Sequence, residues 1–208
     1  MEKKKNQKSS KSIQIDEKKL IERAQSGDFV AFNTLIGDYQ GKIYGLALKL
    51  AKNKEDAEDI FQETFLKAID NIQQFRAESS FGTWLYTIAV NIVRARYGRS
   101  REKDLLSLEE YFPVHQHGEE ADSSLLDWRD PLSKLTDAEV RQKLDTAIKA
   151  LPLKYRMPFL LRYFEEMPIK EVAKTLGLSE AATKSRILRA RLALRQDLNE
   201  YFKERIVS

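Results

Sequence analysis

The sequence lacks cysteine entirely and has only two histidines among its 208 residues. A chain without cysteine forms no disulfide bond and no thiolate metal site, which suits a reducing compartment. It also has no apolar run approaching the roughly 18 to 20 residues that a membrane-spanning helix needs. Its lysine-rich beginning is not followed by an apolar segment, so no secretory signal is predicted. We therefore expect a soluble, cytoplasmic protein with no membrane insertion.

Motifs of catalysis are missing as well. The sequence has no glycine-rich phosphate loop, and no Ser/His/Asp or Cys/His set typical of nucleophilic enzymes. His115 and His117 lie two residues apart without a cysteine nearby. A tight metal site needs three or four converging ligands, so these two histidines do not predict one. We expect no catalytic activity, no metal and no cofactor.

Charge is distributed unevenly, although the net charge is only +4. Residues 1–19 have a net charge of +4, residues 20–100 of zero, residues 101–137 of −6 and residues 138–208 of +6. A basic C-terminal block behind an acidic segment suggests a surface that binds a polyanion, because summed charge steers association. A solubilising basic surface has the same composition, so charge alone does not decide between the two.

Apolar residues recur at three- and four-residue steps in the first half of the chain, which predicts helices. We expect one helix from Asp28 to about Leu50, a second over residues 55–69 and a third over residues 83–97. The segment 73–83 has no clear period and contains Ser-Ser and Gly, so it is expected to be a loop. No alternation typical of strands occurs. The first half is therefore predicted to be all-α.

The second helix has residues that a core stripe does not explain. Its stripe is expected to consist of Ala57, Ile60, Phe61, Thr64 and Ala68. Four residues are left on other faces: Asp59, Gln62, Glu63 and Phe65. Among them Phe65 is unusual, because it is a large aromatic residue beside exposed acids.

Composition divides the chain into four segments. Residues 1–18 are lysine-rich without periodicity and are predicted to be a disordered tail. Residues 19–101 form a first helical domain and residues 136–208 a second. Residues 102–135 are acidic, contain proline and glycine and show no long helical period, so we expect a flexible interdomain linker. The predicted fold class is all-α, with two small helical domains joined by this linker.

The second domain has the layout of a helix-turn-helix. A first helix starts at Pro168 and turns three apolar residues inward: Val172, Ala173 and Leu176. Gly177 can adopt a positive φ at a tight turn. Leu178 follows as a core residue, and Ser179 can cap the next helix.

The second helix of this motif combines a buried edge with a basic outer side. Its buried edge is predicted to consist of Thr183, Ile187, Ala190 and Leu194, with the Thr183 hydroxyl bonded back to the preceding turn. The residues expected to face DNA bases are Lys184, Ser185, Leu188 and Arg189. Arg186 and Arg191 flank them, suited to phosphates. A solvated basic helix on the domain surface is the other reading of this pattern.

Four stretches carry a resemblance to a known family. They read A-E-D-I-F-Q-E-T-F-L-K-A (57–68), F-R-A-E-S-S-F-G-T-W-L-Y-T-I-A-V-N (75–91), L-P-L-K-Y-R-M-P-F-L-L-R-Y-F-E-E-M (151–167) and S-E-A-A-T-K-S-R-I-L-R-A-R (179–191). In this order, over about residues 20–200, the chain resembles bacterial sigma factors of the extracytoplasmic-function group. Ala182 and Thr183 depart from the Thr-Val usual in that family, which removes one possible phosphate contact.

The resemblance implies a factor that recruits core RNA polymerase to promoters and nucleates strand opening. Asp59, Gln62, Glu63 and Phe65 would dock on the β′ clamp helices. The helix-turn-helix would read the −35 element, and its domain would rest on the β flap. The −10 element would be bound by Phe75, Arg76, Ser79, Ser80, Asn91, Arg94, Arg96 and Arg99. Trp84 is expected to pack in the core, the linker to thread the polymerase cleft, and an anti-sigma factor to be a partner.

Two other function classes remain open at this point. A helix-turn-helix regulator would bind operators as a dimer without polymerase, at half-sites about one helical turn apart. A protein-interaction module, such as an anti-sigma-like or scaffold bundle, would bind no promoter DNA. Neither class needs the aromatic and serine-rich loop at residues 75–84 ahead of a basic helix.

Overall fold

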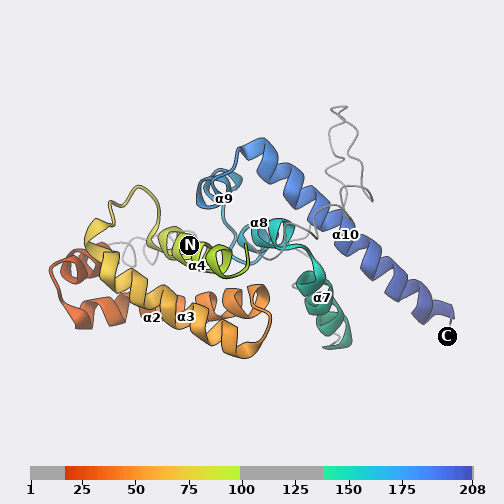
Figure 1. Cartoon of the computed structure of the whole chain (residues 1–208), viewed down its shortest axis with the longest axis horizontal. Coiled ribbons are helices and arrows are strands. Elements are labelled where there is room, and N and C mark those ends of the chain that lie inside the picture. Colours follow the sequence, from red (N-terminus) through yellow and green to blue (C-terminus); the bar gives the residue numbers. More distant parts are fainter. Residues whose placement is uncertain (1–16, 99–137, 208) are drawn as a thin grey trace, which may run out of the picture. The chain divides into compact units, whose positions relative to one another are not determined.

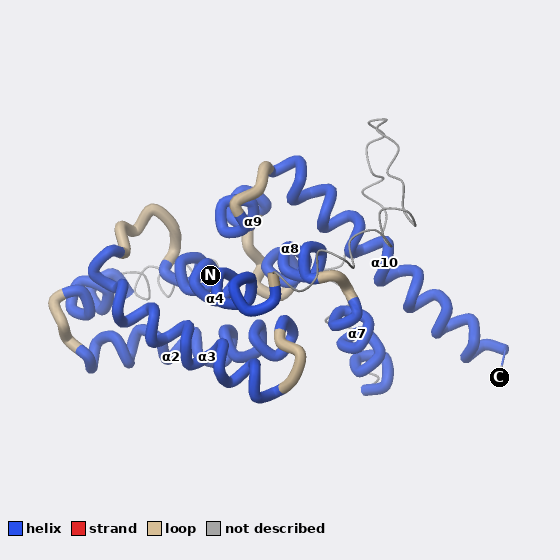
Figure 2. Tube along the Cα trace, viewed as in Figure 1, coloured by secondary structure: helices blue, strands red, loops and turns tan. Residues whose placement is uncertain are grey.

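The computed structural model describes residues 17–98 and 138–207, and every regular element within them is a helix (Figure 1; Figure 2). The all-α class predicted from the sequence is therefore confirmed for the described residues. The chain divides into two compact units, of which the first runs to Ile92 apart from residues 49–51. The acidic linker, with His115 and His117, lies outside the described residues, as does Arg99.

The first unit contains the three helices that periodicity predicts, the last of them as far as Ile92, and two more. A helix over residues 17–25 precedes α2 (Phe29–Leu50), α3 (Lys54–Asn71), the short 3-10 helix η1 (Ile72–Gln74) and α4 (Phe81–Tyr97). Helix α4 begins two residues earlier than predicted. The reason is local: Ser80 Oγ accepts a hydrogen bond from the Thr83 backbone N–H at 3.1 Å and so caps the helix.

The apolar stripes predicted for α2 and α3 are buried with two exceptions. On α2 Tyr39 is half-buried, and the buried members are Phe32, Leu35, Ile36, Ile43, Leu46, Ala47 and Leu50. On α3 they are Ala57, Ile60, Thr64 and Ala68. Phe61, assigned to the same stripe, is only half-buried, so that assignment is wrong. Phe61 follows Ile60 by one residue and is therefore turned about 100° away from the core.

The helix over residues 17–25 and its turn into α2 were not predicted. Residues 17 and 18 are helical, so the predicted end of the tail at residue 18 is wrong. Gly27 adopts a φ of 94°, and Asp28 Oδ1 accepts a hydrogen bond from the Ala31 N–H at 3.0 Å. The Arg23 guanidinium donates to Asp28 Oδ2 at 2.7 and 2.9 Å. The bond from Ala31, followed by those from Arg23, holds the pKa of the Asp28 carboxyl below its ordinary value.

The second unit includes four helices. They are α7 (Ala138–Ala150), α8 (Leu153–Tyr163), α9 (Ile169–Leu176) and α10 (Glu180–Val207), and residues 49–51 and the end of α4 from Val93 are grouped with them. The long helix α10 contacts the other three (Figure 1). The core combines Leu144, Ala147, Ile148 and Leu151 with Tyr155, Phe159, Leu160 and Leu161. None of the described helices, in either unit, is long and apolar enough to cross a membrane.

Candidate nucleic-acid and protein interfaces

The turn between α9 and α10 has the geometry predicted for a helix-turn-helix. Gly177 follows α9 in the left-handed region, with φ 61° and ψ 39°. The Leu178 N–H donates to the Ala173 carbonyl at 2.9 Å, which closes the end of α9. Ser179 Oγ then accepts from the Ala182 N–H at 3.1 Å and caps α10. The roles predicted for Gly177 and Ser179 are confirmed.

Gly177→Ala is expected to destabilise the protein by about 1–2 kcal/mol, because a Cβ raises the energy of the left-handed conformation. Space is not the reason, since no atom lies within 4 Å of the added Cβ. The control is Gly37→Ala, at a helical glycine of α2 that also has no atom within 4 Å and no positive φ. It should stabilise the chain slightly. Chemical unfolding of both variants tests the difference in sign, and equal shifts would contradict it.

The rotation of α10 is fixed by its buried edge. Thr183, Ala190 and Leu194 are fully buried, and Ile187 is 5% exposed. The Thr183 hydroxyl donates to the Ser179 carbonyl at 3.0 Å, one turn earlier. A hydroxyl satisfied within its own helix can be buried without a partner from another element. Both the buried edge and the back-bonded Thr183 are confirmed.

The outer side of α10 presents its candidate DNA-reading residues unequally. Lys184 is exposed, whereas Ser185, Arg186, Leu188, Arg189 and Arg191 are half-buried. The Arg189 Nη1 donates to the Tyr155 hydroxyl of α8 at 3.3 Å. Tyr155 itself is only 2% exposed. Arg189 is thus held against its own domain, while Lys184 extends into solvent.

Phe75 lies in the core and not on the surface of the loop that was predicted to bind the −10 element. It is 7% exposed. Its ring packs against Phe81 and Trp84 of α4, with centroids 5.6 and 5.2 Å away. Trp84 is half-buried in the same cluster. The ring of Phe75 therefore packs against α4, and little of it is exposed.

The polar residues of the loop are accessible to different degrees. Arg76 and Ser80 are exposed and Ser79 is half-buried. The Ser80 hydroxyl is engaged in the cap of α4 and lies 2.9 Å from the Thr83 hydroxyl. On α4 itself, Asn91 and Arg96 are exposed and Arg94 is half-buried. The loop and α4 thus expose Arg76, Asn91 and Arg96, while Ser80 has a structural role.

The α3 residues predicted to bind a protein lie beside a row of aromatic rings. Asp59 and Gln62 are exposed, and Glu63 pairs with Lys67 at 2.9 Å. Phe65 packs edge-on against Phe61, with centroids 5.1 Å apart. Phe61 in turn packs edge-on against Tyr44 of α2 at 5.6 Å.

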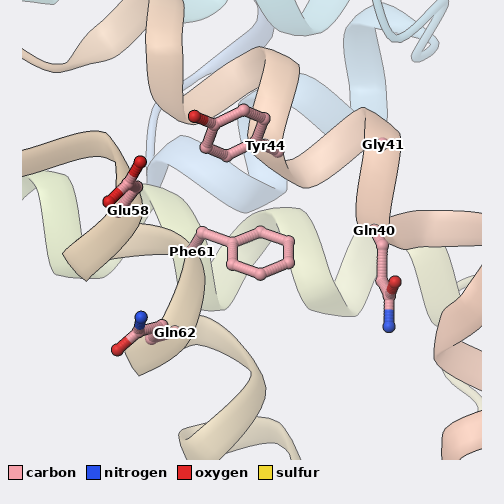
Figure 3. Close-up of a pocket in the computed structure, with 6 residues that line it drawn as sticks. All are labelled: Gln40, Gly41, Tyr44, Glu58, Phe61 and Gln62. Carbon is pink, nitrogen blue, oxygen red and sulfur yellow. The ribbon is translucent and has the colours of Figure 1, made fainter. Parts of the chain in front are cut away.

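An open depression of about 420 Å³ lies between α2 and α3 at this aromatic row. It is lined by Gln40, Gly41, Tyr44, Glu58, Phe61 and Gln62. Figure 3 shows Phe61 of α3 reaching toward α2, where Tyr44 and Gln40 lie. Glu58 and Gln62 both line the depression and are exposed, so they extend it to the exposed side of α3.

Sequence reasoning missed Leu66, which is 63% exposed on α3. It follows Asp59 by seven residues and Gln62 by four, so the three share one face of the helix. That spacing was available in the sequence, since Leu66 lies outside the apolar stripe. Single exposed apolar residues are common on protein surfaces, so it is the position of Leu66 on the same face as Asp59 and Gln62 that makes it a candidate for an apolar contact with another protein. No group of three metal-ligating side chains occurs within residues 17–98 and 138–207.

Known proteins match both units. Sigma-70 region 2 matches residues 35–102, and Sigma-70, region 4 matches residues 141–194. The chain is 33% identical to RNA polymerase sigma-H factor of Pseudomonas aeruginosa, over 92% of this chain and 98% of that protein. It is also 33% identical to ECF RNA polymerase sigma factor SigW of Bacillus subtilis, over 88% and 97%.

The fold also occurs in a solved complex of the sigma factor RpoE with the anti-sigma factor NepR from Bartonella quintana. The TM-score to its sigma factor is 0.58 at 23% identity, covering 81% of this chain and 96% of that chain. The two family matches and the relatives at 33% identity agree with the resemblance seen in the sequence. The chain belongs to the sigma-70 family, in the extracytoplasmic-function group of RNA polymerase sigma factors.

Proposed function

We propose that the chain binds core RNA polymerase, directs it to specific promoters and nucleates DNA opening under the control of an anti-sigma factor. One observation carries the proposal: an exposed loop over residues 76–80 ahead of α4 occurs in one unit, and a helix-turn-helix in another. Two separate DNA-binding units suit a promoter with two separate elements. An operator-binding regulator is not favoured, since it needs no such loop. The cytoplasm, where the polymerase acts, is the proposed location.

Binding to the β′ clamp helices is assigned to α3. Asp59 and Gln62 supply polar contacts, and the exposed Leu66 supplies the apolar anchor. Phe65 is the weaker candidate for that anchor, because its ring is packed against Phe61. Glu63 pairs with Lys67 and contributes its negative charge to the same binding surface.

The −10 element is assigned to the loop and α4. Extruding a base from a duplex costs a few kcal/mol, and a flipped base needs polar groups for its edge. Arg76 and the Ser79 hydroxyl are the groups that the loop offers, above the buried ring of Phe75. Asn91, Arg94 and Arg96 of α4 supply contacts to the base and the duplex backbone, with Arg99 continuing the same basic run.

The −35 element is assigned to the start of α10. Its buried edge presents Lys184, Ser185 and Leu188 away from the core. Lys184 is the leading candidate for a base contact, because it is the exposed basic residue of that surface, and Lys and Arg commonly bind guanine edges. Arg186 and Arg191 supply phosphate contacts. The domain itself rests on the β flap of the polymerase.

In vitro transcription with purified core polymerase and a promoter library tests this function. The expected result is initiation at a defined set of start sites that core polymerase alone does not use. Initiation at no specific site would contradict the proposal. Tight operator binding by the chain without polymerase would instead favour the regulator.

The acidic linker is proposed to enter the polymerase cleft, and replacing its acids by alanine should alter abortive transcription.

Lys184→Ala is expected to cost about 1–3 kcal/mol of promoter binding at one or two −35 positions and little elsewhere. Arg189→Ala should differ, because the Arg189 guanidinium also bonds to Tyr155. For Arg189→Ala, the loss of promoter binding should be similar across promoter sequences, and the stability of the protein should also fall. Transcription from −35 variants measures both effects, with a scrambled −35 element as the control. A uniform loss from Lys184→Ala would make that residue a phosphate contact instead.

A further inference from the structure

One side-chain amide links the first helix to the far end of α3. Gln25, at the end of the helix over residues 17–25, donates from Nε2 to the Phe75 carbonyl at 2.8 Å and to the Ile72 carbonyl at 3.1 Å. These residues are 50 and 47 positions away in sequence. A primary amide has two N–H donors, so one Gln25 side chain can serve both carbonyls. The side chain is half-buried, which limits access of water as a substitute.

The two carbonyls lie where the chain leaves its helical path. The Phe75 N–H bonds back to the Ile72 carbonyl at 3.1 Å, which closes the single turn of η1. Phe75 is then extended, with φ −69° and ψ 113°. The Gln25 amide adds a second donor to the Ile72 carbonyl and supplies a donor to the Phe75 carbonyl. It therefore joins the start and the end of this turn at the point where the loop departs.

The exposed loop is held at its other end by Ser80. The Ser80 hydroxyl caps α4 through the Thr83 N–H at 3.1 Å. Between the two fixed ends, Ala77 adopts a φ of 54°, a region that non-glycine residues rarely enter. A backbone in that region persists only where its surroundings hold it. The packing of the Phe75 ring on α4 and the Gln25 amide on the Phe75 carbonyl fix the chain two residues before Ala77.

Local hydrogen bonds connect the first helix to the start of α2. Two Arg23 nitrogens donate to the same Asp28 oxygen, Oδ2, at 2.7 and 2.9 Å, and the Ser26 hydroxyl donates to the Arg23 carbonyl at 2.7 Å. Gln25 lies within this segment, so these bonds help to determine where its amide is presented.

We propose that Gln25 is a positioning residue for promoter opening. It holds residues 76–80 in the conformation that receives the extruded base of the −10 element, without touching DNA itself. This inference rests on the proposed function of the chain as a sigma factor. Preorganising a loop lowers the ordering cost at the moment of binding. Without the amide, the free energy of ordering the loop would be spent at the step in which the base binds.

Two substitutions separate hydrogen bonding from shape. Gln25→Met keeps the length of the side chain without donors, and Gln25→Glu keeps the shape but directs a carboxylate at two carbonyls. With the full chain and core polymerase, we expect Gln25→Met to slow opening of duplex promoters about tenfold, equivalent to about 1.4 kcal/mol. Gln25→Glu should be slower still. Affinity for core polymerase should stay within about twofold, since α3 presents the same exposed face.

The control is Gln73→Met, which replaces an exposed glutamine of η1 and should leave opening unchanged. Hydrogen exchange over residues 76–79 should rise in both Gln25 variants while α3 remains protected. Opening at the wild-type rate in both variants, or a parallel loss of polymerase affinity, would overturn the positioning role. If the wild-type chain opens no promoter, the proposed function fails, and the role of Gln25 fails with it. Normal opening by the wild type and by both variants would reject only the latter.

Discussion

Phe75→Ala should lower the free energy of unfolding of the first unit by about 3–5 kcal/mol, because it empties an aromatic core site. The ring is 7% exposed and contacts Phe81 and Trp84. Its loss would leave a cavity beneath the loop. Equilibrium unfolding of the full chain measures the effect, followed by tryptophan fluorescence, to which Trp84 beside Phe75 contributes. Below the unfolding transition, DNA opening should also be impaired, since the loop loses its support.

Arg76→Ala is the matched control for Phe75→Ala. Arg76 is the exposed neighbour in the same loop, so its replacement should change stability by less than about 0.5 kcal/mol. It should nevertheless weaken promoter opening if it contacts the −10 element. An unchanged unfolding curve for Phe75→Ala, together with lost opening, would show that the ring leaves the core and binds the base directly.

Leu66→Asp should weaken binding to core polymerase by about 2 kcal/mol or more, roughly 30-fold, which is typical of a central interface residue. The side chain is 63% exposed, so the substitution should leave the fold unchanged. Fluorescence anisotropy of the labelled chain with core polymerase measures the affinity. Circular dichroism verifies that the helices remain.

Val30→Asp provides the control for Leu66→Asp, because Val30 is 69% exposed near the start of α2. It introduces the same charge at an exposed apolar residue that the proposed clamp surface does not include. Its polymerase affinity should equal that of the wild type. Equal losses from both variants would mean that added negative charge is responsible and not the position of Leu66.

The helix-turn-helix could be predicted from the sequence in detail because its determinants are local. Gly177 meets a backbone requirement for positive φ, Ser179 meets a hydrogen-bonding requirement, and Thr183 satisfies its own hydroxyl within one turn. None of these depends on a distant partner. The buried edge of α10 follows from helical spacing alone.

The aromatic residues were harder to place, because their depth depends on which other element packs against them. Periodicity gives the direction of a side chain around a helix axis but not what covers it. Phe61 was assigned to the core and is half-buried beside Tyr44. Phe75 was expected to help bind the −10 element and is buried beside Phe81. In both cases, the decisive neighbour is on another helix.

The first helix and Gln25 were missed for a related reason. Residues 17 and 18 were assigned to the lysine-rich tail and residues 19–25 to the first domain, but their weak apolar pattern predicted no helix there. The amide of Gln25 acts on carbonyls 47 and 50 residues away. No rule of local spacing connects such positions. The contact of Arg189 with Tyr155 could not be predicted for the same reason, because the two residues are 34 positions apart in sequence.

Helix α10 is one continuous element, so a tilt applied at one of its ends also moves the other end. With 28 residues and a rise of about 1.5 Å each, the helix is about 42 Å long. A tilt of about 10° around its midpoint would move each end by roughly 3.6 Å, close to the roughly 3.4 Å that separates successive base pairs. A partner that binds the C-terminal turns of α10 and tilts the helix would therefore shift its N-terminal end along the promoter, without touching the DNA.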